Sequence, residues 1–132
     1  MTRKTKQMAE LRGLTNLALR AVQLELAQLG SKERALRQNL TDLTTQRSDR
    51  AQAIHDSGDP AFTAGADLRW HQWVDQRRAV INIELVRVMA QIDQCQGRLR
   101  RTFGRDQAVQ SLADRVERAE IVEKGRAALY ES

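Results

Sequence analysis

The chain contains few of the residues from which globular cores are built: its 132 residues include two tryptophans, two phenylalanines and one tyrosine. Charged residues make up 30% of the sequence, and Ala, Leu, Gln and Arg are abundant. This composition is typical of long helices with narrow apolar faces rather than of a large globular core. The only proline, Pro60, stands almost at the midpoint.

Long apolar runs are also absent. No stretch of 18 apolar residues occurs, so we expect no membrane insertion. The basic N-terminal sequence MTRKTKQMAELRG lacks the apolar region of a secretory signal. The single cysteine, Cys95, cannot form an internal disulfide and is compatible with a reducing compartment. These features favour a cytoplasmic protein.

The sequence motifs of catalysis are missing as well. Neither His55 nor His71 stands in metal-ligand spacing, and there is no phosphate-binding glycine-rich loop or nucleophile elbow. Single carboxylates such as Glu33 and Asp106 interrupt apolar positions and read as polar layers that set helix register. We therefore expect no enzyme, no catalytic residue, no metal site, no cofactor and no small-molecule substrate.

What the sequence does contain is helical periodicity. In the first half, steps of three and four residues connect a row of mostly apolar positions: Met8, Leu11, Thr15, Ala18, Val22, Leu26, Leu29, Glu33, Leu36, Leu40, Leu43, Arg47, Arg50 and Ile54. The consecutive steps of four from Ala18 to Leu26 predict a stutter that locally unwinds a supercoil. The row keeps its phase across Gly30-Ser31, which predicts one continuous helix there.

The stretch HDSGDPAFTAGAD, residues 55–67, breaks this pattern with Gly58, Asp59-Pro60 and Gly65, which are turn formers. A strict heptad row then follows: Val74, Arg78, Ile81, Leu85, Val88, Ile92, Cys95, Leu99, Thr102, Asp106, Val109, Ala113 and Val116. Beyond Thr102 the row becomes polar, at Asp106 and again at Glu120, so that end is expected to be weakly held or to need a partner.

Two such segments joined by a short connection predict an all-α fold, a long two-helix antiparallel coiled-coil hairpin. We expect one domain over residues 1–132, with a helix at about 5–55, a loop at about 56–66 and a helix at about 67–128. Pairing about the loop places Ile54 near Trp70, Leu43 near Ile81 and Val22 near Leu99.

Charge and aromatics leave alternatives open. The excess of positive charge lies in residues 1–50, with ten Lys/Arg against five Asp/Glu, which allows a nucleic-acid-binding coiled coil; interleaved acidic residues at the C-terminal end argue against it. A second alternative is a self-assembling structural rod in which another copy completes the polar C-terminal seam. Trp70 and Trp73 flank the seam and are expected either to widen it over Ala51 and Ile54 or to form an exposed aromatic patch.

After the expected loop, Arg69-Trp70 is followed three residues later by Trp73 and then by heptads rich in Gln and Arg, as in WHQWVDQRRAVINIELVRVMAQIDQCQGRLR. In these residues and its two long helices the chain resembles the small cytoplasmic stalk proteins of flagellar and type III secretion export systems, the FliJ/YscO type. The resemblance spans most of the chain. It implies a hairpin similar to the central shaft of rotary ATPases, acting as a non-enzymatic stalk and chaperone escort in the cytoplasm, peripheral to the membrane export apparatus.

The resemblance also implies partners: the export ATPase hexamer, the export gate membrane protein and export chaperones. The helix termini would enter the ATPase pore, and charge placement suggests the residues that bind there: Arg3, Lys4, Lys6, Arg101 and Arg105. By position, the gate surface would comprise Asp42, Gln46, Asp49, Gln76, Val80, Ile83 and Arg87, with Trp70 and Trp73 as its aromatic part.

Overall fold

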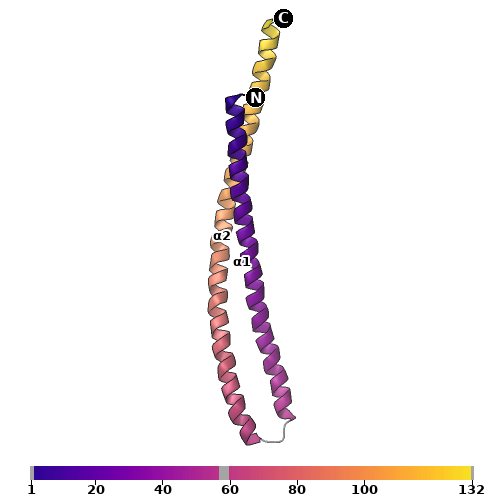
Figure 1. The fold of residues 1–132 in the computed structure, drawn as a ribbon, viewed down its shortest axis with the longest axis vertical. Coiled ribbons are helices and arrows are strands. Elements are labelled where there is room, and N and C mark those ends of the chain that lie inside the picture. The colour runs from indigo at the N-terminus through magenta and orange to yellow at the C-terminus, as the bar shows by residue number, and fades with distance from the viewer. Residues whose placement is uncertain (1, 57–59, 132) are drawn as a thin grey trace. The chain divides into compact units, whose positions relative to one another are not determined.

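The protein consists of two long helices. The computed structural model describes residues 2–56 and 60–131, and the side chains of all of these except 60–63. Helix α1 spans Arg3–His55 and helix α2 spans Pro60–Glu131, and the described residues contain no strand. Figure 1 shows the two helices running in opposite directions (Figure 1). The all-α helical hairpin predicted from the heptad rows is confirmed.

The helix limits follow from local chemistry. Helix α1 contains no proline and passes through Gly30 without a break, as predicted. Helix α2 begins at Pro60, earlier than expected, because proline fits the first helical position, where its missing N–H has no helical partner. Gly65 is helical, and Arg69 Nε donates to its carbonyl oxygen at 3.5 Å. The predicted loop is therefore shorter than 56–66, and its positions 57–59 lie outside the described residues.

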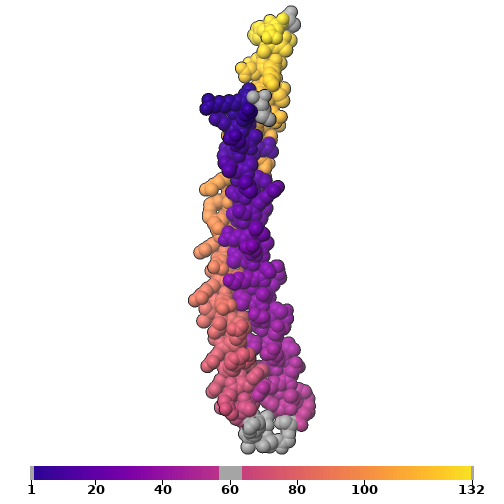
Figure 2. All heavy atoms as spheres, viewed as in Figure 1, coloured from indigo at the N-terminus to yellow at the C-terminus, as the bar shows by residue number. Residues whose placement is uncertain are grey.

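The helices form two compact units, each containing part of both helices. The central unit is Ala27–Asp93, and the terminal unit combines Met1–Leu26 with Gln94–Ser132. In both units the helices are antiparallel, because partner residues rise in number along α1 as they fall along α2. In Figure 2 the side chains of α1 and α2 meet over much of the length of α1, and the yellow end of α2 lies beyond it.

The central unit has an aliphatic core. A cluster of buried residues from both helices fills the contact, with Leu40 and Ile92 packed against it: Leu36, Leu43, Ile81, Leu85 and Val88. Ile81 is 1% exposed and Val74 is fully buried. The predicted proximity of Leu43 and Ile81 is confirmed. Burying side chains of this size contributes about 1.5–3 kcal/mol each, so this unit has a strong apolar contribution to its stability.

The terminal unit has a smaller and more polar core. Its buried side chains are Leu19, Cys95, Asp106, Ala113 and Val116. The Cys95 thiol donates to the Val22 carbonyl oxygen at 3.7 Å. The two polar residues that were predicted to stand in the contact row both lie between the helices: Asp106 is 2% exposed and Glu120 is half-buried.

The heptad row of α1 differs from the prediction at Leu11, Ala18 and Arg47, all of which are exposed. Leu19 is buried and Ala18 is exposed, so the row runs Thr15, Leu19, Val22 and Leu26 in regular steps of four, three and four. The predicted stutter is wrong, because the larger apolar side chain takes the contact position and keeps the heptad intact. Arg47, also assigned to the row, is exposed, whereas Arg50 is half-buried.

Within the described part of the chain, neither α1 nor α2 has a segment apolar enough over sufficient length to cross a membrane.

Candidate protein-interaction surfaces

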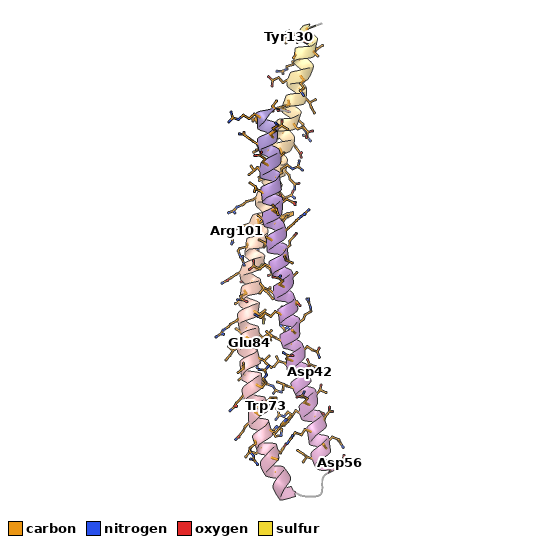
Figure 3. The ribbon with its side chains drawn as sticks, in the orientation of Figure 1. Asp42, Asp56, Trp73, Glu84, Arg101 and Tyr130 are labelled. Atoms are coloured by element: carbon orange, nitrogen blue, oxygen red, sulfur yellow. The ribbon has the colours of Figure 1, made fainter. Side chains whose placement is uncertain are left out.

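A groove lies along one side of the central unit. Helix α1 lines it with Asn39, Asp42, Leu43 and Gln46, and helix α2 lines it with Trp73, Arg77 and Ile81. Leu43 and Ile81 form its floor because they belong to the buried core. The indole of Trp73 is 52% exposed, and Figure 3 labels Trp73 and Asp42 on the two facing helices (Figure 3).

The rim of this groove is chemically mixed. Gln38 Nε2 donates to Asp42 Oδ1 at 2.9 Å. Because Gln38 stands one helical turn before Asp42, this hydrogen bond holds the carboxylate against α1. Arg77 brings a cation to the α2 side, and the amides of Asn39 and Gln46 bring donors and acceptors. An accessible tryptophan bordered by one anion, one cation and amides is the kind of anchor that is enriched at protein interfaces.

A second groove repeats the first one along the same face. It is lined by Lys32, Glu84, Arg87, Val88 and Gln91. Lys32 stands seven residues before Asn39, and Glu84 stands seven residues after Arg77, so these side chains occupy equivalent positions on their helices. The two grooves therefore form one surface of the central unit, hereafter the groove face.

The two tryptophans have different environments. Trp70 is half-buried beneath Arg50, whose Cζ lies 4.8 Å from the ring centroid, a cation–π contact. The His71 ring meets Trp70 edge-on, with centroids 5.3 Å apart. Asp67 Oδ1 lies 3.2 Å from His71 Nε2 and 3.8 Å from Arg50 Nε. Trp70 is thus part of the helix contact, and Trp73 is the accessible one.

The structure divides the expected gate residues into three groups. Asp42, Gln46 and Trp73 share the first groove and Arg87 lines the second. Asp49 and Val80 stand seven residues from Asp42 and Trp73, so each falls on the same side of its helix. The remaining residues lie elsewhere: Trp70 packs under Arg50, and Gln76 and Ile83 are exposed on the side of α2 opposite α1.

The expected ATPase-binding residues are all exposed in the terminal unit, but they form two groups. Thr5 Oγ1 donates to Glu120 Oε1 at 2.6 Å, which fixes the level of Arg3, Lys4 and Lys6. Ten residues along α1, Thr15 Oγ1 donates to Asp106 Oδ1 at 2.9 Å, next to Arg105. Ten residues span about 15 Å of helix. This separation exceeds the Debye length of about 8 Å at physiological salt, so the two basic groups act as separate patches of charge.

The end of α2 extends past the beginning of α1. Glu120 already bonds the hydroxyls of Thr2 and Thr5 at the first turn of α1, and residues 121–131 follow it as an exposed helical segment, hereafter the α2 extension. It carries exposed apolar side chains: Ile121, Val122, Leu129 and Tyr130. Figure 3 labels Tyr130 in this segment, at the far end of α2 (Figure 3).

Two carboxylates of the terminal unit are stabilised in their charged form. Arg98 donates two hydrogen bonds to Glu25, at 2.7 and 2.9 Å, and these bonds lower the pKa of Glu25 and raise that of Arg98. The hydroxyls of Thr2 and Thr5 lower the pKa of Glu120 by donating to its carboxylate. Hydrogen bonds to the ionised form cause both reductions.

Sequence reasoning missed several of these side chains. Arg77 and Asn39 line the first groove, and each stands one helical turn from a predicted residue, Trp73 or Asp42, so helix spacing could have found them. The Arg50 contact with Trp70 depends on the register between helices, which no local signal contains. Among the described residues no group of three or more His, Cys, Asp or Glu is placed to hold a metal ion.

Compared with protein-family models, with curated proteins and with solved structures, the chain matches none of them.

Proposed function

We propose that this chain is a non-enzymatic stalk of a flagellar or type III protein export apparatus, which binds the export ATPase hexamer and the export gate in the cytoplasm. The observation that carries the proposal is the first groove, which gathers three of the gate residues expected by resemblance, Asp42, Gln46 and Trp73, around one accessible indole. A two-helix antiparallel pair is also the form that the resemblance implies for such a stalk.

The terminal unit supports the ATPase part of the proposal. Its contact is polar at Asp106 and Glu120, and the α2 extension exposes apolar side chains beyond the first turn of α1. Exposed apolar side chains gathered on one helical segment are suited to a partner surface. Arg3, Lys4 and Lys6 lie at the same end of α1, where they offer positive charge to an acidic or polar pore.

The test is ATP hydrolysis and ring assembly by the export ATPase of the same source, measured with and without the chain. We expect stimulation that saturates near a single chain per ATPase ring. Changing Arg3, Lys4 and Lys6 together to glutamate should weaken this binding without loss of helicity. Changing Arg101 and Arg105 to glutamate is the matched comparison, since these residues form the separate basic group.

Binding to the export gate is tested by a separate substitution. Trp73→Ala, which removes an accessible side chain, should abolish capture by detergent-solubilised export gate protein and leave ATPase stimulation intact. Trp70→Ala is its control, because it removes a side chain of the helix contact and should lower the melting temperature instead. Absence of stimulation together with absence of co-elution would remove the stalk proposal.

A further inference from the structure

Helix α2 of the central unit is apolar on two opposite sides. Buried positions Val74, Ile81 and Val88 face α1. Two residues along a helix turn the side chain by about 200°, so positions two residues from the buried ones point away from α1. Those positions, together with Asp93, are all exposed and follow one another in steps of three or four residues: Gln76, Ala79, Ile83, Val86, Ala90 and Asp93.

This second row has the features of a helix contact. Ile83 and Val86 are 55% and 66% exposed, and the neighbouring Val80 is 47% exposed. Small alanines flank the two large side chains, at Ala79 and Ala90, which permits close approach of another helix. Of the two sides of α2 that carry these apolar residues, α1 covers only one.

The row is also self-complementary when two copies run antiparallel. If Ile83 of one copy packs on Val86 of the other, the same twofold axis pairs Ala79 with Ala90. It also pairs Gln76 with Asp93, so that an amide donor meets a carboxylate. At the flank, Val80 falls beside the aliphatic stem of Arg87, and no like charges meet among these pairs.

A parallel arrangement does not share this property. It pairs each residue with its own copy, so Asp93 would face Asp93 in the contact, which is unfavourable. The antiparallel contact is isologous, because the twofold axis repeats each of its residue pairs.

We propose that this outer face of α2 is a homodimer interface, in which two copies of the chain associate antiparallel about a twofold axis between Ile83 and Val86. The proposal does not depend on the export function, although Gln76 and Ile83 are also expected gate residues and Arg87 lies at the edge of the groove face. The contact spans about 26 Å of helix and falls at the small end of specific interfaces. The expected dissociation constant is on the order of 10–100 µM.

The test is sedimentation equilibrium of the full chain over a range of concentrations. We expect the mass to rise from monomer to dimer. Ile83→Asp should weaken association at least tenfold and leave helicity by circular dichroism unchanged, because this side chain is exposed in the monomer. Val122→Asp, which places the same charge at a similarly exposed valine of the α2 extension, should leave the dissociation constant unchanged.

Substitutions at Gln76 test the direction of pairing. Gln76→Lys should tighten the dimer through attraction to Asp93 of the other copy, and Gln76→Glu should weaken it. A parallel dimer would be weakened by both, because each would face its own copy. A monomeric mass up to ~1 mM, a dimer insensitive to Ile83→Asp, or weakening by both Gln76 substitutions would overturn the proposal.

Discussion

The central unit places leucine, isoleucine and valine between its helices, whereas the terminal unit places an aspartate and a half-buried threonine and glutamate at the corresponding heptad positions. Both units use the same spacing and the same pair of helices. Their contacts differ in what the helices bury: aliphatic side chains contribute free energy in proportion to area, while polar layers contribute mainly a preference for one register.

The comparison suggests a division of labour. The aliphatic contact of the central unit keeps the helices paired and holds the groove face in shape. The polar contact of the terminal unit keeps the register through Thr15 with Asp106 and Thr5 with Glu120. Under the proposed function, binding of the ATPase would add stability to this unit.

The largest expected effect is loss of the central core. Ile81→Ala, at a side chain 1% exposed, should lower the free energy of unfolding by about 2–5 kcal/mol. Ile83→Ala is the matched control on the same helix, since Ile83 is 55% exposed and its truncation should change stability by no more than about 0.5 kcal/mol. Urea unfolding followed by circular dichroism, at a concentration where the chain is monomeric, measures both. Equal losses would contradict an aliphatic core at Ile81.

The polar layer of the terminal unit should respond differently. Thr15→Val removes the hydroxyl that donates to Asp106 and leaves that buried oxygen without a donor, at a cost of about 1–3 kcal/mol. Adding Asp106→Leu removes the carboxylate itself, so the double variant should regain or exceed the original stability. Melting temperatures test this, and a double variant less stable than Thr15→Val alone would show that the layer stabilises the fold.

The residues of these two contacts also show how much of the fold could be predicted from the sequence. The heptad row of α2 was predictable from Val74 to Val116 because an apolar or small residue stands at most steps of three or four, with Arg78 and Asp106 as exceptions. The choice between Ala18 and Leu19 was not, because both fit helical spacing nearby and only the position of α2 decides between them. Gly65 shows the same limit, since helix continuation overrode its preference for a turn.

For the candidate site, composition and spacing located the correct segments but not the different environments of Trp70 and Trp73. That difference arises from Arg50, which stands on the other helix and covers Trp70. A contact of this kind depends on the register between helices to within a residue or two, and the sequence specified it only to within about one turn.

The smallest expected effect is on pH dependence of the terminal unit. Glu25 and Glu120 have pKa values below their ordinary value of 4.5 in the folded chain. Their stabilising contribution is therefore fully present above that value and is lost as the pH falls through the lower folded pKa. Thermal unfolding at pH 7 and pH 3 should show a smaller drop for the Glu25→Gln, Glu120→Gln variant than for the original chain. An unchanged drop would contradict these two contacts.

The most direct test of the division between the units is amide hydrogen exchange, followed by mass spectrometry, on the free chain and on the chain with the export ATPase. We predict faster exchange in the terminal unit of the free chain than around Leu36 to Leu43 and Ile81 to Val88. With the ATPase, protection should rise in the terminal unit and the α2 extension and stay unchanged in the central unit. Equal protection of both units, with no change on adding the ATPase, would contradict the account.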